Sequence, residues 1–190
     1  FAEYIPLRGL ARMVSKRVDL VVHDFVAGTR PGVLNVGGVT VGDAICFEVA
    51  YDNIVRDTVT GGAQLLTVQT NNADFDIAEA SQQLAMVRLR AVEHGRDSLM
   101  VSTVGISGFV DASGGVHNAT GFNVVATELR DLRLGGQRTL ATELGPIPEF
   151  VASGLAIGIL LGAVWLRHRI RSGERRSGPT PTTGHKVTAA

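Results

Sequence analysis

The sequence predicts an α/β domain followed by one membrane-spanning helix, and three observations lead to this prediction. Short β-branched runs alternate with helical segments between residues 39 and 129. A stretch of 17 uncharged residues, Phe150–Leu166, comes later and is followed at once by basic residues. The formal charge is zero, but six of the 18 basic residues and only one of the 18 acids follow Leu166, so a body of net charge −5 precedes a tail of +5. Such asymmetry indicates a boundary between two environments.

Composition excludes several classes of function. The acidic body argues against nucleic-acid binding, which needs clustered Lys and Arg on the folded part. A single cysteine excludes an internal disulfide framework and a multi-cysteine zinc site. The five histidines are scattered without ligand spacing, and the paired glycines form no phosphate-binding fingerprint. We therefore expect no metal and no cofactor.

The first part of the α/β domain reads as a βαβ unit. Val39–Cys46 and Gln64–Thr70 are apolar, β-branched runs that predict two strands. Residues 50–60 between them fit a crossover helix, which implies that the two strands are parallel. A short helix is predicted near Leu10–Val18.

Residues 76–94 give the clearest helix signal. Asp76 can cap its start with Glu79 in a capping box, and Gly95 provides the stop. Apolar residues at three- and four-residue steps predict one buried face, formed by Ile77, Ala80, Leu84, Val87 and Ala91. Strands are predicted at 98–104, 107–111 and 122–129, with a turn at 112–115.

The apolar run Phe150–Leu166 is about 25 Å long as a helix, slightly short of a ~30 Å hydrocarbon core. Snorkelling of Arg167 can cover the difference. The basic residues that follow predict a cytoplasmic C-terminus and an extracytoplasmic domain. Gly154, Gly158 and Gly162 share one helix face, which predicts packing against other transmembrane helices. The alternative to a membrane span is a buried helix of a soluble domain. The alternative to helix packing is that the glycines are present only because glycine is common in membrane helices.

Cys46 ends the first predicted strand, at the edge where α/β folds place their chemistry. A thiol at a helix N-terminus is favoured as the reactive thiolate. On these grounds alone a buried core cysteine is the commoner reading. Three arginines, Arg88, Arg90 and Arg96, fit solvated helix charges or ion pairs better than a phosphate site.

The wider pattern around Cys46 resembles the nitrilase (carbon–nitrogen hydrolase) superfamily and, within it, the apolipoprotein N-acyltransferases. The segments that carry this resemblance are Phe1–Pro6, Gly42–Glu48, Thr70–Phe75, Arg88–Arg96 and Gly105–Asp111. The resemblance implies a nitrilase-like αββα sandwich, incomplete because its N-terminal part is missing, followed by one C-terminal transmembrane helix. The expected divisions are residues 1–145 for the catalytic domain, 147–167 for the membrane helix and 168–190 for a basic, disordered cytoplasmic tail.

The resemblance also implies an enzyme of lipoprotein maturation in the bacterial inner membrane. Cys46 would be the nucleophile that takes an acyl chain from a phospholipid donor and passes it to the diacylglyceryl-modified N-terminus of an apolipoprotein. Glu48 and Glu3 match supporting acidic positions, although either can instead be a structural ion-pair carboxylate. Some relatives work beside a polyprenol-phosphate mannosyltransferase, which is a further implied partner.

Two departures from the family pattern qualify these expectations. The general-base glutamate and the oxyanion lysine of the family fall upstream of Phe1, so we expect the chain alone to be an inactive C-terminal fragment. Asp74 stands where an aromatic residue is common, and Gln82–Gln83 stands where a histidine is frequent. The rival functions are a nitrilase-type amidase that uses water, and a membrane-tethered module without catalytic activity.

Overall fold

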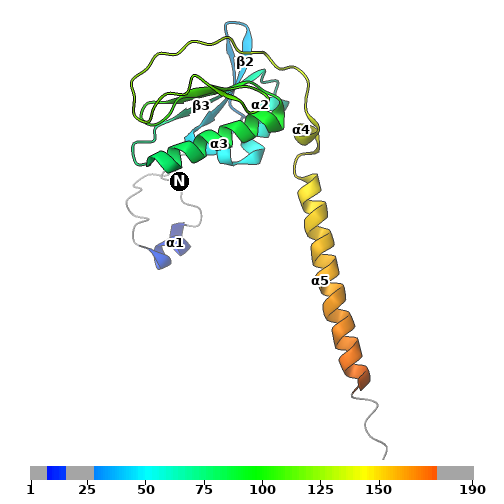
Figure 1. The fold of residues 1–190 in the computed structure, drawn as a ribbon. Helices are drawn as coiled ribbons and strands as arrows, with labels where there is room; N and C mark the ends of the chain where they lie inside the picture. Colours follow the sequence, from blue (N-terminus) through cyan, green and yellow to red (C-terminus); the bar gives the residue numbers. More distant parts are fainter. Residues whose placement is uncertain (1–7, 16–27, 175–190) are drawn as a thin grey trace, which may run out of the picture. The chain divides into compact units, whose positions relative to one another are not determined.

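A computed structural model describes residues 8–15 and 28–174, with residue 8 and residues 169–174 described by their backbone alone. The chain divides into two compact units, residues 1–145 and 146–190. The first is a mixed α/β unit, and the second contains one long helix (Figure 1). The segment Phe1–Pro6, with Glu3, and the tail beyond residue 174 lie outside the described residues.

The first unit is built on a six-stranded sheet whose spatial order follows the chain order, β1 to β6. These strands are β1 (Val33–Val36), β2 (Val39–Ile45), β3 (Leu65–Thr70), β4 (Ser98–Ser102), β5 (Gly108–Val110) and β6 (Val116–His117). The three central strands β2, β3 and β4 are parallel, whereas β1, β5 and β6 join antiparallel to their neighbours. The predicted parallel pair is thus confirmed, with Val41 opposite Leu65 and Ile45 opposite Gln69.

Two helices cover one face of this sheet and enclose the core (Figure 1). Helix α2 (Asp52–Thr60) is the predicted crossover between β2 and β3, and α3 (Ile77–His94) leads to β4. The core consists of small and β-branched side chains from the sheet and both helices: Ala44, Val49, Val55, Val59, Ala63, Leu66, Val68, Ala80, Val87, Ala91, Met100, Ile106 and Val110. Gly42 lets α2 approach β2 closely, because a Cβ atom there would lie 2.8 Å from Thr58 Oγ1.

Local signals set the ends of α3 as predicted. The Asp76 carboxylate accepts the backbone N–H of Glu79, and the Glu79 carboxylate accepts that of Asp76. Gly95 ends the helix with a left-handed φ of 60°, a conformation that favours glycine. The predicted buried face begins only at Ala80, one turn into the helix, so the prediction for Ile77, which is 59% exposed, was wrong.

The predicted strand at 122–129 does not form. Residues 118–139 instead run as an extended segment without regular secondary structure. Several hydrogen bonds tie its later part to the domain, among them Gly135 N–H to the Gln64 carbonyl, Arg133 N–H to the Asp97 carboxylate, and the Arg96 guanidinium to the Gln137 carbonyl.

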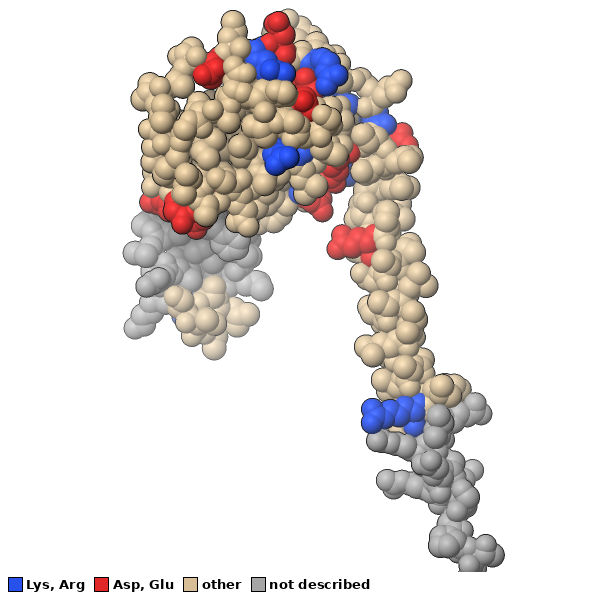
Figure 2. All heavy atoms as spheres, viewed as in Figure 1, with Lys and Arg blue, Asp and Glu red and all other residues tan. Residues whose placement is uncertain are grey.

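The other α-helices of the described residues are α1 (Arg8–Val14), the short α4 (Leu140–Leu144) and α5 (Ile147–Glu174). Among the described residues, one helical stretch, Ile147–His168, is long and apolar enough to cross a membrane, with a mean hydropathy of 1.9. Figure 2 shows charges of both signs on the first unit, whereas α5 carries none between Glu149 and Arg167. The helix continues to Glu174, into residues that the sequence assigned to the tail.

Candidate active site

Cys46 is the first residue after β2 and begins a short 3-10 helix, η2 (Cys46–Ala50). Its φ of 52° lies in the left-handed region, which a residue with a Cβ rarely adopts. Such a conformation costs about 1–3 kcal/mol and persists only where the surroundings enforce it. The turn therefore holds the thiol in a position that the backbone by itself disfavours.

Two sets of hydrogen bonds enforce this turn. On the sheet side, the Glu48 carboxylate accepts the backbone N–H of Ile45 at 2.8 Å. On the helix side, the buried guanidinium of Arg90 in α3 donates to the carbonyls of Val49 and Ala50, each at 2.9 Å. The residues on both sides of Cys46 are thus fixed to β2 and to α3.

The sulfur atom of Cys46 faces two polar side chains. The Thr70 hydroxyl oxygen lies 3.2 Å from Sγ, and Gln83 Nε2 lies 3.7 Å from it. Thr70 ends β3 and Gln83 comes from α3, so three elements converge on the thiol. Both side chains are buried, at 6% and 3% exposure, while Cys46 itself is half-buried. An attacking sulfur needs this combination, with a fixed orientation on one side and access for a substrate on the other.

Glu48 lies in the same short helix as Cys46, but its carboxylate is not a hydrogen-bond partner of the sulfur. Its carboxylate binds the Ile45 N–H and lines a separate cavity of about 510 Å³ together with Asp43 and Asp57. Glu3, the other predicted supporting residue, lies outside the described residues. The two lysines of the chain, Lys16 and Lys186, lie outside them as well.

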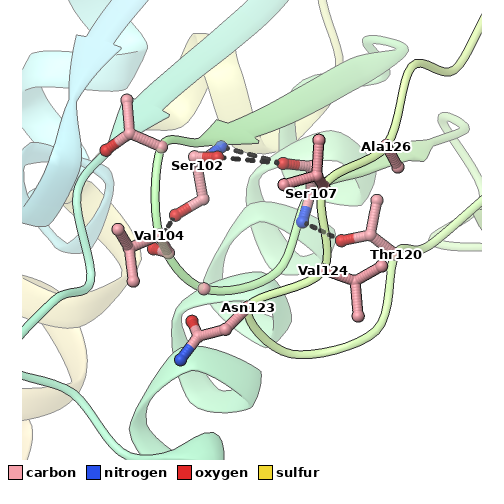
Figure 3. A pocket seen from close by; sticks show the side chains of 10 residues that line it. Ser102, Val104, Ser107, Thr120, Asn123, Val124 and Ala126 are labelled. Atoms are coloured by element: carbon pink, nitrogen blue, oxygen red, sulfur yellow. Dashed lines mark hydrogen bonds between the residues drawn. The ribbon is translucent and has the colours of Figure 1, made fainter.

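A second cavity, of about 250 Å³, opens at the same edge of the sheet, at the end of β4 (Figure 3). Ser102 and Ser107 line one side, and the start of the extended segment, at Thr120 and Asn123, lines the other. The Ser107 N–H donates to Thr120 Oγ1 at 2.9 Å, which joins the two sides. Cys46 does not line this cavity. Thr103, which does, donates its backbone N–H to the carbonyl of Thr70, the neighbour of the thiol, at 3.1 Å.

Among the groups with a shifted pKa, His94 and Asp111 lie apart from the thiol. Burial lowers the pKa of His94, whose Nδ1 lies 2.9 Å from Thr142 Oγ1. The hydrogen bond with His117 holds the pKa of Asp111 well below its usual range, and Ser113 and Gly115 add further bonds in the same turn. Both groups fix local structure. Within the described ranges, no group of three or more His, Cys, Asp or Glu side chains is placed to hold a metal ion.

Sequence reasoning placed Cys46 at a strand end but missed the residues that surround its sulfur. Thr70 and Asn72 lie within a segment that carries the family resemblance, and Gln83 belongs to one of the departures from it, yet nothing in the spacing shows that Thr70 and Gln83 meet the thiol. Arg90 was read as a solvated charge or an ion-pair partner. Arg90 does form ion pairs, with Asp52 and Glu93, but its side chain is buried. It also donates a hydrogen bond to the Val49 carbonyl in the turn that contains Cys46.

Comparison with known proteins decides the relationship. The chain is 38% identical over 182 residues to apolipoprotein N-acyltransferase of Mycolicibacterium smegmatis, a match that covers 95% of this chain and 30% of that protein. The chain is a relative of the apolipoprotein N-acyltransferases. The enzyme of Gloeobacter violaceus is 34% identical, over 85% of this chain and 31% of its own length, and that of Geobacter metallireducens is 29% identical.

The chain spans about a third of the length of these apolipoprotein N-acyltransferases. No family model matches it. Among solved structures, it is similar to an amidase of Nesterenkonia sp. AN1. One structure of that amidase, with acrylamide added at its active-site cysteine, has a TM-score of 0.45 at 24% identity and covers 53% of this chain and 42% of the amidase. Another has a TM-score of 0.48 at 20% identity, over 70% and 50% of the two chains.

Proposed function

We propose that this chain carries the nucleophile of a membrane-bound N-acyltransferase, which moves an acyl chain from a phospholipid to the N-terminal amine of a lipid-modified apolipoprotein. The kinship with apolipoprotein N-acyltransferases supports the reaction class. The observation that carries the assignment of the nucleophile is the strained turn at Cys46, which presents a half-buried thiol at the carboxyl edge of the parallel strands.

The proposed reaction has two steps. In the first, the Cys46 thiolate attacks the ester carbonyl of the phospholipid; a C–S bond forms, the C–O bond breaks, and the released alcohol takes up a proton. In the second, the amine of the acceptor attacks the thioester; a C–N bond forms, the C–S bond breaks, and the thiol is restored. A basic group must accept the amine proton, and donors must stabilise the oxyanion of each tetrahedral intermediate.

Apolar side chains beside the thiol favour a lipid donor. Ile45, Phe47 and Tyr51 flank Cys46 along the chain and remain 48%, 39% and 47% exposed. The rings of Phe47 and Tyr51 pack edge to face, with centroids 6.0 Å apart. An acyl chain that contacts these side chains would remove apolar surface from water, at about 25 cal/mol per Å². A small, soluble amide would gain little from the same surface.

The first unit fits one half of a nitrilase-like αββα sandwich. Helices α2 and α3 cover only one face of the sheet. The opposite face presents Val41, Leu65, Leu99 and Phe109, which are only partly buried, and Val101, which is 51% exposed. A sheet face with this many apolar side chains is normally covered by a second layer. We assign residues 1–145 to this domain.

The second unit fits a membrane anchor. Its apolar stretch has 22 residues, which at 1.5 Å per residue reaches about 33 Å, enough for a ~30 Å hydrocarbon core. Arg167 lies at the end of this stretch and Arg169 and Arg171 follow it, so the C-terminal end of the helix would lie in the cytoplasm and the catalytic domain on the outer side. Residues 147–167 are the proposed membrane segment and 168–190 the basic tail.

The test uses the full-length protein in phospholipid vesicles, with a diacylglyceryl-modified lipopeptide as acceptor. In the absence of acceptor, mass spectrometry is expected to find one acyl group on the peptide that contains Cys46. Addition of the lipopeptide should discharge this thioester and give an N-acylated product. The matched control is Cys46→Ala, which should form neither the thioester nor the product.

Two results would contradict the proposal. Product formation by Cys46→Ala at the wild-type rate would show that another group is the nucleophile. Ammonia release from a lipid amide, without transfer to the lipopeptide, would instead assign the site to an amidase.

A further inference from the structure

We propose that Thr70 is a positioning residue for the reaction, because its hydroxyl donates a hydrogen bond to the Cys46 thiolate and the buried amide of Asn72 directs that donation. This inference rests on the proposed function in that Cys46 is taken as the nucleophile. It assigns a role to two residues that the reaction scheme above does not use.

The Thr70 hydroxyl lies within hydrogen-bond distance of three acceptor atoms. Cys46 Sγ is 3.2 Å away, Asn72 Oδ1 is 2.7 Å away, and Gln83 Oε1 is 3.2 Å away. A hydroxyl group carries a single hydrogen, so it can donate only one full bond at a time. The three acceptors therefore compete for one hydrogen.

The unpartnered atom of Asn72 shows how this competition can be resolved. Asn72 is fully buried, and its Nδ2 group is left without a hydrogen-bond partner, although buried N–H groups almost always have one. The oxygen and nitrogen of an amide occupy nearly the same volume, so which atom faces Thr70 follows from the hydrogen-bond network. A half-turn of the Asn72 amide brings Nδ2 to the Thr70 oxygen, where it donates a bond.

With Asn72 in this orientation, the hydrogen bonds run in one direction. Asn72 donates to the Thr70 oxygen, and the Thr70 hydroxyl hydrogen is released for Cys46. A negatively charged sulfur is the strongest acceptor in the group, because hydrogen bonds to ionised groups are about twice as strong as neutral ones. Gln83 Nε2, at 3.7 Å from Sγ, adds a second donor. The backbone bond from Asn72 N–H to the Val104 carbonyl, at 3.0 Å, holds the main chain that carries this side chain.

This arrangement acts on the sulfur in the attacking state. The Thr70 hydroxyl donates its hydrogen without transferring it, so the thiol proton still leaves to a separate base. Once the sulfur becomes part of a thioester, its negative charge is gone and the bond from Thr70 weakens. Thr70 thus orients and stabilises the thiolate before attack.

The single cysteine of the chain allows a direct test by alkylation with iodoacetamide, with the labelled peptide measured by mass spectrometry. The chain is used at full length in detergent. At pH 7 we expect Thr70→Val to slow alkylation of Cys46 about tenfold, because the variant keeps the side-chain shape but loses a hydrogen bond to a charged group. Thr70→Ser restores the hydroxyl and should restore the rate. At pH 10, above the ordinary range of cysteine ionisation, the rates should converge.

The matched control is Thr67→Val on the same strand. Thr67 donates a 2.8 Å bond to Asp43 Oδ1, so its loss removes a comparable bond without touching the sulfur. We expect this control to alkylate at the wild-type rate. If Thr70→Val does not fold, as judged by circular dichroism, Gln83→Met takes its place and should slow alkylation at pH 7 in the same way.

Equal alkylation rates at pH 7 for the wild type and a folded Thr70→Val variant would overturn the inference. A slowing that persists unchanged at pH 10, or that Thr67→Val reproduces, would also overturn it, since both point to a general structural effect. None of these rates depends on acyl transfer. The inference can therefore fail while Cys46 remains the nucleophile, and it can hold even if the acyl donor is not a phospholipid.

Discussion

Arg90 of α3 donates from its Nε atom to the carbonyl oxygen of Val49, 2.9 Å away, and so ties the helix to the turn that presents Cys46. The same guanidinium binds the Ala50 carbonyl and pairs with Asp52 and Glu93. One buried side chain therefore fixes the backbone directly after the thiol. The position of the candidate nucleophile depends on the helix that packs behind it.

Replacing Arg90 with Met should loosen this turn. The variant leaves the buried Val49 carbonyl and the partly buried Ala50 carbonyl without their donor, and we expect a loss of about 2–3 kcal/mol in the free energy of unfolding. The lost pair with Asp52 adds little, because the Asp52 side chain is 72% exposed and screened by water. Urea unfolding followed by circular dichroism measures the change. Arg88→Met is the control, since Arg88 binds the distant Gly114 carbonyl; an equal loss in the free energy of unfolding for both variants would contradict a specific role for Arg90.

Two substitutions at Glu48 separate the shape of its carboxylate from its charge. Glu48→Gln keeps an oxygen that can accept the Ile45 N–H, so we expect the stability of the wild type within about 0.5 kcal/mol. Glu48→Ala removes the acceptor and should cost about 1 kcal/mol, as for a lost helix cap. The free energy of unfolding is the measurement. Equal destabilisation by both variants would mean that the charge, and not the hydrogen bond, supports the turn.

Gly42→Ala should disturb the packing between β2 and α2. The added methyl group would lie 2.8 Å from both the Ala63 side chain and Thr58 Oγ1, and such overpacking costs about 1–3 kcal/mol. The midpoint of urea unfolding reports this loss. Gly28→Ala is a matched control, because its added methyl group would meet only the Arg30 carbonyl at an ordinary 3.8 Å. A Gly42→Ala protein as stable as this control would show that α2 shifts without cost.

His94 should make stability depend on pH. Burial lowers its pKa below the ordinary value of 6.5, Glu93 opposes this shift, and the nearby Arg90, Arg96 and Arg56 reinforce it. The unfolded chain therefore binds a proton at a pH where folded His94 stays neutral. Its contribution to stability is complete above pH 6.5 and declines as the pH falls below that value.

The corresponding measurement is the free energy of unfolding between pH 7.5 and 5.5. We expect it to fall with pH in the wild type and to change less in His94→Gln. Parallel curves for the two proteins would show that His94 is not the group responsible. Asp111 affects stability in a separate pH range. Its pKa is depressed in the folded protein, so its contribution to stability is lost only as the pH falls below 3.8, the ordinary pKa of an aspartate.

Gly158→Leu should impair association of α5 with neighbouring membrane helices. A Cβ atom at Gly154, Gly158 or Gly162 meets no other atom within 4 Å, so this face is open to a close partner. In the full-length protein, cross-linking within the membrane should decrease, while Leu160→Ala, also on α5, serves as the control. Unchanged cross-linking and activity in Gly158→Leu would remove the case for helix packing through these glycines.

The parts of the fold that follow from local signals could be predicted from the sequence. The β2–α2–β3 unit follows from two β-branched runs around a crossover, and the ends of α3 follow from Asp76, Glu79 and Gly95. The strand expected at 122–129 failed because β-branched composition reports local preference and not the partners that the folded chain provides, and the later part of this segment is bonded to Gln64, Arg96 and Asp97 instead. In the segment that forms instead, Val125 and Leu129 are 101% and 93% exposed. Strand β1 was missed, since four residues give too short an alternation.

In the candidate site, too, one residue could be predicted from local sequence signals and the others could not. Cys46 could be placed at a strand end because the strand itself was recognised. Thr70 and Gln83 come from elements that lie 24 and 37 residues further along the chain, and only the parallel register and the packing of α3 bring them to the sulfur. The buried role of Arg90 was hidden for the same reason, since its carbonyl partners are 40 and 41 residues away.

At Cys46, the left-handed backbone conformation opposes the stability of the fold to the proposed chemical role of the thiol. Glycine adopts this conformation without steric cost, so Cys46→Gly would relax the turn and give the more stable protein. The protein therefore has a cysteine at a position where its backbone conformation favours glycine. A screen that selects only for thermal stability would be expected to discard the thiol first.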